Sequence, residues 1–331
     1  MGRLRVLTWH VHGSYLESLG AIGHEILVPV RPGRPEGYRG RPPDADWPPS
    51  IREVPAEEVG DIEVDVVLFQ ARRNWLEDQW AILSPRQRRG PRIYLEHDPP
   101  REHPTDTRHV VDDPDVTIVH VTAFNELMWD SGASPTRVIE HGVTIPAGVT
   151  WTGERARGIV VVNHLVERGR RVGFDVVRRV AAEVPLDLVG MGSEALGGRG
   201  EVRRHDLAGV EAPYRFFFHP ARYTSFGMAV CEAMLLGMPI VALATTEMPT
   251  VVENGMSGYV DTSVPRLVEA MQGLIEDPDL ARRLGDNARR VAEARFGIDR
   301  FRREWDAVLH EVTGTTTSPD GPVPAAAEAR A

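Results

Sequence analysis

The stretch RFFFHPARYTSFGMAVCEAMLLGMPIVAL, from Arg215 to Leu243, contains the pattern that decides the fold. Its apolar start, Phe216–Phe218, predicts a buried strand, and a turn and an apolar helix follow up to Leu236. Gly237 ends the helix, as glycine commonly does, and Ile240–Leu243 predicts the next strand. A strand, a helix and another strand in this order are typical of a parallel sheet covered by helices.

The same alternation continues in both directions along the chain. In the first half the predicted strands are Leu4–Thr8, Glu25–Val28, Val64–Phe69, Arg92–Leu95, Thr117–Val121 and Arg137–Ile139. The second half adds predicted strands at Gly158–Val162 and Leu186–Val189, and amphipathic helices at Val264–Glu276, Pro278–Arg295 and Ile298–Val312. The predicted fold class is therefore α/β, with two Rossmann-like, doubly wound domains that face each other across a cleft, and with C-terminal helices.

Chain length and a break in the pattern set the predicted domain boundaries. A chain of 331 residues suggests about two domains, and the alternation pauses around Pro146–Arg157, where Pro, Gly and Thr gather. We predict a first domain over residues 1–150, a second over residues 151–312, and a disordered tail over residues 313–331. Because open α/β sheets bind ligands at the carboxyl ends of their strands, we expect the site where the two sets of strand ends face each other.

Composition disfavours several classes of protein. The formal net charge of -10 argues against a nucleic-acid partner, and no apolar run approaches the roughly 20 residues of a membrane span. No signal peptide precedes the first predicted strand, so we expect a cytoplasmic protein. Cys231 is the single cysteine, and its apolar neighbours predict a buried thiol. The 38 Lys+Arg side chains are all arginine, so arginine must supply any cationic group.

The turn and helix after Phe216–Phe218 carry the first chemical signal. A helix N-terminus has free N–H groups and a positive dipole end, so the helix start at Ser225–Met228 predicts an anion site suited to phosphate. Glu232 is the only charged residue between Phe226 and Glu247, in a helix that is apolar on every side. A buried lone carboxylate is costly without a partner. The two adjacent hydroxyls of a ribose would suit it, and a salt bridge to an arginine is the alternative.

The run SFGMAVCEAMLLGMPIVALATTEMPTVVENGMSGYV, from Ser225 to Val260, resembles the donor-site signature of retaining GT-B glycosyltransferases of family 4. That signature has an acidic residue, a Phe-Gly turn, a second Glu, then Ala-Met, Gly-x-Pro and Pro-x-Val-Val-x-x-Gly. The resemblance implies a retaining glycosyltransferase of the hexosyltransferase type that uses a nucleotide-diphosphate sugar, with no metal or other cofactor. The first domain would bind the acceptor, which could be a sugar, a lipid-linked sugar or a small molecule, and the second domain would bind the donor.

The resemblance also implies roles for single residues in this run. Glu232 would bind the ribose, and the segment Ser225, Phe226, Gly227 and Met228 would present backbone amides to the sugar and diphosphate. Thr224 stands where the family has the first glutamate, which contacts the transferred sugar, and Thr250 stands where a Glu usually follows the proline. Thr224 is therefore a donor-binding candidate whose effect on the choice of sugar stays open.

A turn rich in arginine follows the Gly158–Val162 strand. The resembled family uses an Arg and a Lys here to neutralise the departing diphosphate, and Val172 stands at the usual lysine position. Arginine binds phosphate oxygens in a bidentate fork, so Arg170 is predicted to be the catalytic cation. The alternative is a solvated basic turn. The predicted donor-binding residues of this region are Asn163, Arg168, Arg171 and Gly190.

Two predicted first-domain strands end in histidine-containing segments. After the first strand come His12 and Gly13, where the family places a glycine loop over the donor phosphates. His97 resembles the histidine of the family's His-Asp segment, which contacts the transferred sugar or the acceptor, so we predict that it is catalytic. Asp98 could instead cap the turn before the following prolines, and His141 is interpreted as structural.

Three Asp-x-Asp pairs have the spacing that metal-dependent glycosyltransferases of another fold use, namely Asp44/Asp46, Asp113/Asp115 and Asp277/Asp279. Each lies in a proline-containing turn or helix cap, so no metal site is predicted. Two alternative functions stay open. One is a sugar-nucleotide epimerase or hydrolase of the same fold, and the other is a non-catalytic sugar-nucleotide-binding partner, suggested by Thr224. The oligomeric state is not predicted.

Overall fold

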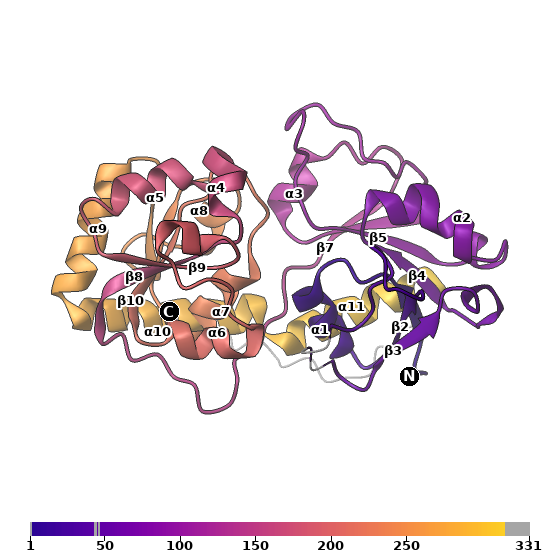
Figure 1. Cartoon of the computed structure of the whole chain (residues 1–331). Coiled ribbons are helices and arrows are strands. Elements are labelled where there is room, and N and C mark those ends of the chain that lie inside the picture. Colours follow the sequence, from indigo (N-terminus) through magenta and orange to yellow (C-terminus); the bar gives the residue numbers. More distant parts are fainter. Residues whose placement is uncertain (1, 43–44, 46, 315–331) are drawn as a thin grey trace, which may run out of the picture.

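Two α/β domains lie side by side in the structure, each built on one sheet (Figure 1). The structure is a computed structural model that describes residues 2–42, 45 and 47–314. Every strand pair in both sheets is parallel, and helices connect most successive strands. The predicted fold class, two doubly wound domains followed by C-terminal helices, is therefore confirmed.

The first domain has a 7-stranded sheet in the order β3-β2-β1-β4-β5-β6-β7. Because β1 lies between β2 and β4, the strand order reverses there, and such a reversal opens a crevice at the carboxyl ends of the two strands. The elements are β1 Arg5–Thr8, α1 Gly13–Gly20, β2 Glu25–Val30, β3 Ile51–Pro55, β4 Val66–Phe69, α2 Gln79–Ile82, β5 Arg92–Glu96, β6 Val116–His120, α3 Ala123–Met128 and β7 Thr136–Val138.

The second domain has a 5-stranded sheet in the order β12-β11-β10-β8-β9, which reverses between β8 and β10. Its strands are β8 Arg155–Val161, β9 Leu186–Val189, β10 Tyr214–His219, β11 Ile240–Leu243 and β12 Gly258–Asp261. Its helices are α4 Leu165–Arg168, α5 Phe174–Val180, α6 Arg204–Glu211, α7 Met228–Leu236, α8 Met248–Val251, α9 Val264–Glu276 and α10 Pro278–Phe296. The last helix, α11, spans Ile298–Thr313.

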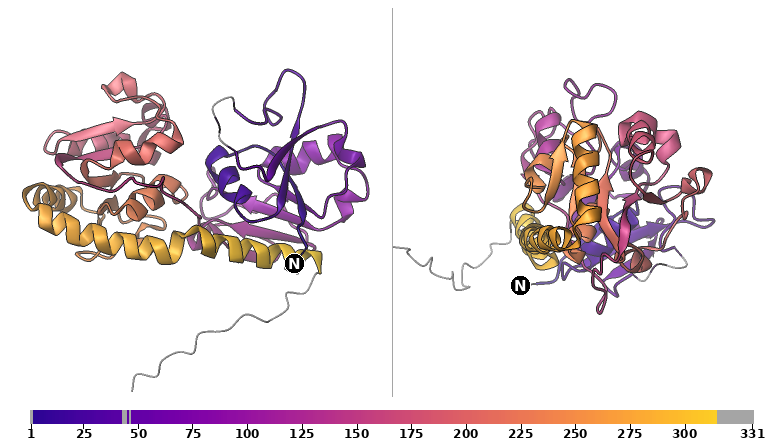
Figure 2. Two further views of the ribbon diagram at one scale, coloured as in Figure 1. Left: turned by 90° about the horizontal axis from the view of Figure 1, so that it is seen from below. Right: turned by 90° about the vertical axis from the view of Figure 1, so that its left-hand side faces the viewer.

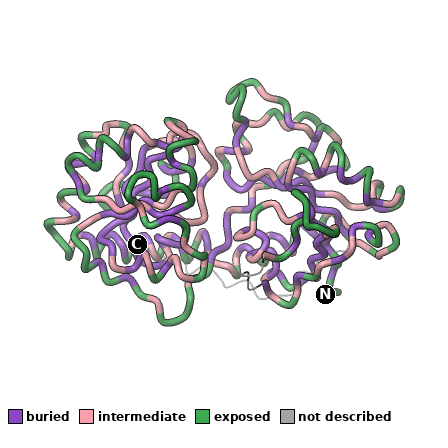
Figure 3. Tube along the Cα trace, in the orientation of Figure 1, coloured by how far each residue is buried: buried purple, intermediate pink, exposed green. Residues whose placement is uncertain are grey.

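Burial explains why the central strands form. Every residue of β4 and β10 is buried, which suits strands that have helices on both faces. Figure 3 shows buried chain running through the middle of both domains. Cys231 is fully buried in α7, as predicted. No helix among the described residues is long and apolar enough to cross a bilayer.

The last two helices connect the domains. Figure 2 shows α10 and α11 running one after the other beneath both domains. Ala281 and Ala288 of α10 belong to the second-domain core, whereas Phe301 and Trp305 of α11 pack in the first-domain core. The sequence grouped residues 298–312 with the second domain, and their packing corrects this, because the apolar face of α11 covers the first sheet. The Asp277 side chain accepts a hydrogen bond from Leu280 N at 2.9 Å and caps α10, as predicted.

Some elements differ from the sequence interpretation. Strand β3 was not predicted, since its pattern of buried and exposed residues is irregular and it pairs only with β2 at the sheet edge. Helix α11 includes Thr313, the first residue of the predicted tail. The rest of that tail from residue 315, and the pair Asp44/Asp46, lie outside the described residues.

Candidate active site between the two domains

A cavity of about 1220 Å³ lies between the domains. It is lined from the first domain by the segments that follow β1, β2, β5 and β7, and from the second domain by those that follow β8, β9 and β10. The predicted site residues that line it are His12, Gly13, His97, Asn163, Gly190, Thr224, Ser225, Phe226, Gly227, Met228 and Glu232. The predicted cations Arg168, Arg170 and Arg171 are not among its lining residues.

The N-terminus of α7 forms one wall of the cavity. Gly227 precedes the helix in an extended conformation, and Met228 and Ala229 line the cavity in its first turn. The buried ring of His141 lies 2.6 Å, through Nε2, from the carbonyl oxygen of Phe226. That oxygen only accepts, so Nε2 carries the proton and donates. Because C=O and N–H point in opposite directions across a trans peptide, this bond also fixes the direction of the Gly227 N–H.

Glu232 is buried in α7 and is paired with an arginine. The Nε and Nη2 groups of Arg204 both bind its Oε1, at 3.2 and 3.1 Å. The salt bridge that the sequence left as an alternative to ribose binding is thus present. Desolvation raises the pKa of Glu232, the Arg204 charge opposes this rise, and the charge of Glu17 adds to it. Both arginine contacts use Oε1, so Oε2 is available to a ligand in the cavity.

His97 forms part of the opposite wall. Its Nε2 lies 2.9 Å from Oε1 of Gln70. The amide nitrogen of Gln70 donates to Thr8 Oγ1 and Trp9 O, so the Gln70 oxygen must accept and His97 Nε2 must donate. Burial, followed by the charges of His12 and His141, lowers the pKa of His97 well below its usual value. The ring is therefore neutral near pH 7, with Nδ1 as its acceptor nitrogen.

His12 packs edge-on against His97, with ring centroids 4.3 Å apart. Burial lowers the pKa of His12 as well, so these two rings form a neutral wall. On the second-domain side, Asn163 Oδ1 accepts a hydrogen bond from Met191 N at 2.9 Å and holds the turn after β9. Gly190 in that turn has φ +130, and a Cβ there would lie 2.5 Å from Val162 O. Only glycine fits this close approach.

The arginine turn between β8 and α5 points elsewhere. Arg170 Nη1 donates to Asp175 at 2.7 Å, and its side chain is 74% exposed. Arg222 binds the same carboxylate through both terminal nitrogens, at 2.6 and 2.8 Å. Arg168 is more enclosed. Desolvation and the charge of Arg171 lower its pKa, and Asp98 of the first domain acts in the opposite direction. A charge of the facing domain therefore acts on Arg168, whereas Arg170 is paired with a carboxylate of its own domain.

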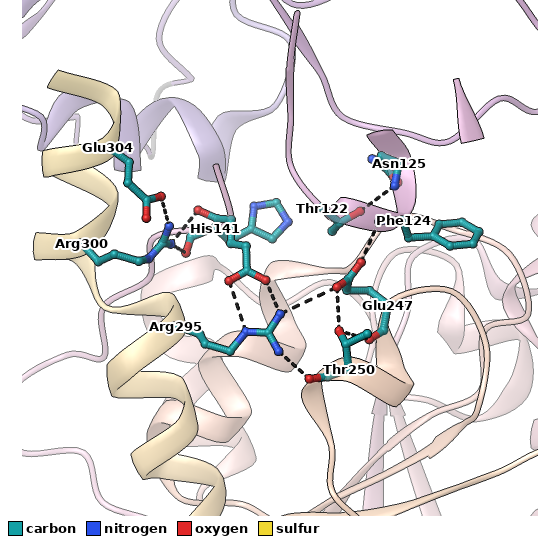
Figure 4. A network of polar contacts seen from close by, with 10 residues as sticks. Thr122, Phe124, Asn125, His141, Glu247, Thr250, Arg295, Arg300 and Glu304 are labelled. Carbon is teal, nitrogen blue, oxygen red and sulfur yellow. Dashed lines mark hydrogen bonds and ion pairs between the residues drawn. The ribbon is translucent and has the colours of Figure 1, made fainter. Parts of the chain in front are cut away.

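A polar network next to the cavity holds the domains together (Figure 4). Glu247 of the second domain accepts a hydrogen bond from Phe124 N at the start of α3, at 2.9 Å, and from Thr250 Oγ1 at 2.6 Å. Arg300 of α11 donates to the backbone oxygens of Glu140 and His141, each at 2.7 Å. Helix α11 therefore holds the chain between the domains at Glu140 and His141.

Asn125 and Thr122, at the same junction, were not among the residues predicted from the sequence. Asn125 Nδ2 donates to Ser225 Oγ at 3.2 Å and to His97 O at 3.2 Å, so it connects both walls of the cavity. Its own helix is capped by Thr122, which accepts from Asn125 N. The Thr-x-x-Asn spacing is the only signal for this helix start, and it carries no information about what lies across the cleft.

Three side chains are close enough to hold a metal ion, and they lie outside the cavity. Within the described residues, His24, Asp306 and His310 have ligand atoms within 4.8 Å of one another. Leu4 N donates to His24 Nδ1 at 3.2 Å, so the neutral His24 ring carries its proton on Nε2, which faces Asp306. A protonated Nε2 donates to Asp306 instead of binding a metal. Asp113, of the Asp113/Asp115 pair, binds Arg92 at 3.3 Å.

Known proteins are similar in sequence to parts of this chain. Residues 200–291 match the family model of glycosyl transferases group 1. The chain is 33% identical over 129 residues to a D-inositol 3-phosphate glycosyltransferase of a Nocardioides species, which covers 34% of this chain and 28% of that protein. It is 25% identical over 95 residues to the alpha-D-kanosaminyltransferase of Streptomyces kanamyceticus, covering 28% of this chain and 25% of that protein. These matches thus span only about a quarter of each relative.

Solved structures match over nearly the whole chain. The sucrose-phosphate synthase of Thermosynechococcus elongatus has a TM-score of 0.71 at 17% identity, over 95% of this chain and 100% of that chain. Anabaena HepE in complex with UDP-glucose has a TM-score of 0.62 at 16% identity, over 93% of this chain and 100% of that chain. Residues 200–291 of the second domain are thus similar to the glycosyl transferases group 1 family, and the chain as a whole has the GT-B fold of these solved structures.

Proposed function

We propose that this protein is a glycosyltransferase that transfers a sugar from a nucleotide-diphosphate sugar to an acceptor held by the first domain. The observation that carries the proposal is the interdomain cavity, where the start of α7 and the carboxylate of Glu232 face the neutral imidazole of His97. A helix start suits a diphosphate, and a carboxylate suits the paired hydroxyls of a ribose. The similar proteins include a kanosaminyltransferase and a D-inositol 3-phosphate glycosyltransferase, and HepE is in complex with UDP-glucose in its solved structure.

The proposed chemistry needs stabilisation of the departing diphosphate. The amides at residues 227–229 would interact with its charge in a site already formed before the reaction, which is the most effective form of electrostatic catalysis. An arginine of the 168–171 turn would supply the cation, so that no metal is required. We further propose that the anomeric configuration is retained, as in the resembled family, and that the reaction takes place in the cytoplasm.

His97 is proposed to orient the transferred sugar or the acceptor. The proton of the neutral ring is on Nε2, which donates to Gln70 Oε1, so Nδ1 is an acceptor. Nδ1 would therefore accept a hydrogen bond from a sugar hydroxyl. Thr224 lines the cavity at the position of the family's first glutamate, and its hydroxyl can both donate and accept. The sugar end of the site is therefore neutral where the resembled family has a charge.

The test is nucleotide binding followed by transfer. Thermal-shift assays with UDP, GDP, ADP, dTDP and their glucose conjugates should show stabilisation by one base. The change Glu232→Gln should weaken binding of that nucleotide by about 1.5–3 kcal/mol, because one charged hydrogen-bond acceptor is lost. If no nucleotide stabilises the protein at millimolar concentration, the proposal fails.

Product analysis separates the remaining functions. Transfer to an added acceptor supports a glycosyltransferase, whereas rapid conversion of the sugar nucleotide without an acceptor would indicate an epimerase or hydrolase. Binding with no turnover under any condition would indicate a non-catalytic partner.

A further inference from the structure

The side chain of Arg204 connects the two domains inside the cavity. It belongs to the first turn of α6 in the second domain and is 24% exposed. Its Nη1 donates to Ser14 O at 2.6 Å and to Glu17 Oε2 at 2.7 Å, and both acceptors belong to α1 of the first domain. Its Nε and Nη2 bind Oε1 of Glu232. One guanidinium thus joins the carboxylate of α7 to the facing domain.

The charges around Arg204 give it a specific task. Glu232 is buried, and both burial and the negative charge of Glu17 raise its pKa, while Arg204 lowers it. The buried carboxylate of Glu211 on α6 also lies in the electrostatic surroundings of Glu232, so without the guanidinium Glu232 would be near the carboxyl groups of both Glu17 and Glu211 and would lack its paired cation. Arg204 therefore favours the ionised form of Glu232, and it does so from Oε1, so that Oε2 can accept hydroxyl groups.

We propose that Arg204 is a positioning residue for nucleotide recognition: it holds Glu232 ionised and oriented, and because its other arm is anchored on α1, the nucleoside end of the site is complete only while the two domains are in contact. This inference rests on the proposed nucleotide site. It extends that site to a residue from another helix and to the first domain. Arg204 would act through Glu232 and would itself touch neither the sugar nor the diphosphate.

The neighbouring Arg203 provides a matched control. It also lines the cavity, but its side chain is 60% exposed and binds Asp206 at 2.9 Å, within its own helix turn. The two arginines are adjacent and identical in type, and they differ in the partner that they contact. Arg203→Met and Arg204→Met therefore remove the same group, and only the second removes the contact with Glu232.

Calorimetric titration over a pH series tests the proposal. The probe is the ribonucleoside diphosphate, among UDP, GDP and ADP, that binds the unmodified protein, together with its 2′-deoxy counterpart. In Arg204→Met the pKa of Glu232 should rise further, so that affinity for the ribonucleotide falls about tenfold near pH 6 and recovers towards pH 8. The unmodified protein and Arg203→Met should not show this recovery. The preference for the ribonucleotide over its 2′-deoxy counterpart should shrink in Arg204→Met alone.

Two further variants keep the test decisive if Arg204→Met folds poorly. Arg204→Lys keeps the positive charge and should restore a flat pH profile with an intermediate affinity. Glu17→Gln removes one of the two first-domain acceptors of Arg204 and one negative charge, and it leaves Ser14 O in place, so its affinity should fall by less than that of Arg204→Met, with a flat profile. If Arg204→Met binds as Arg203→Met does at every pH, this inference is overturned and the proposed function stands. If the unmodified protein binds no nucleotide, both fail.

Discussion

Two arginine-bearing segments of the second domain, residues 168–171 and residues 203–204, direct their guanidinium groups to different places. In the first segment Arg170 lies on the surface against Asp175, whereas in the second Arg204 binds Glu232 of its own domain and Glu17 of the facing domain. Both segments come after a strand of the second sheet, the first with three arginines and the second with two. In each segment the arginine is paired with a carboxylate of another element, Asp175 of α5 for Arg170 and Glu17 and Glu232 for Arg204.

The comparison also suggests a division of labour. The second segment acts on the nucleoside end through Glu232, and the first remains the only predicted source of cations for the diphosphate. Within the first segment, Arg168 is the better candidate, because desolvation lowers its pKa and Asp98 of the first domain lies in its electrostatic surroundings. The motif in the sequence favours Arg170, which in the structure is exposed and paired with Asp175.

The largest expected effect comes from replacing Arg168 and Arg170 in two separate variants. Arg168→Met should lower kcat about 10²–10³-fold, the usual cost of removing one electrostatic donor from a reacting anion. Arg170→Met should change kcat by less than about tenfold, since the charge of Arg170 is paired with Asp175 and screened by water. Initial rates at saturating donor measure both. A larger loss in Arg170→Met would mean that the Asp175 pair breaks when the donor binds.

A smaller effect is expected from His141, whose hydrogen bond to Phe226 O holds the residue before the N-terminus of α7. In contrast to the two arginine segments, this helix start would bind an anion through backbone amides. His141→Leu leaves the buried Phe226 carbonyl without its donor and should lower the free energy of unfolding by about 1–3 kcal/mol. His141→Gln can restore the hydrogen bond and should recover part of this loss. Urea unfolding at pH 7.5 measures both variants, and equal losses in the two would argue against the hydrogen bond as the cause.

His141 should also make the free energy of unfolding depend on pH. Burial lowers the pKa of His141 to about 4, whereas the unfolded chain binds this proton below about pH 6.5. The stability contributed by the neutral ring is therefore present above about pH 6.5 and is lost as the pH falls towards 4, by about 3 kcal/mol at most. His141→Gln should show a shallower fall of unfolding free energy over this interval.

The fold was predictable because its signals are local. Apolar runs such as Phe216–Phe218 and helix stops such as Gly237 recur with α/β spacing, and the parallel strand order follows from that alternation. Strand β3 was missed because an edge strand buried on one side lacks such a run. Helix α11 was assigned to the wrong domain because its apolar face does not say which core it covers.

The site was predictable only in part, for a related reason. Residues that follow strand ends, such as His97 and Gly227, gather at the cavity because parallel strands place their carboxyl ends together. Arg204 and Gln70 were missed because their importance lies in partners far along the chain, namely Glu232 and His97. No spacing rule connects residues 28 or 27 positions apart on different elements.

The smallest expected effect concerns Asp175, which keeps the first arginine segment on the surface. Arg222 holds the pKa of Asp175 below its usual value, so the pair contributes stability above about pH 4 and loses it as the pH falls further. Because this carboxylate is 36% exposed, Asp175→Asn should cost only about 0.2–1 kcal/mol of unfolding free energy near neutral pH. Thermal unfolding at pH 7 and pH 3 measures this difference, which should nearly vanish at the lower pH.

The same variant releases Arg170 from its carboxylate and thereby tests the comparison of the two segments. If Arg170 is held away from the cavity by Asp175 alone, Asp175→Asn should raise the affinity for the nucleoside diphosphate about two- to threefold, less than one hydrogen bond is usually worth. Arg222→Met, which leaves the Arg170 pair in place, should not raise it. Unchanged affinity in both variants would show that the backbone of the turn, more than its acidic partner, keeps Arg170 out of the site.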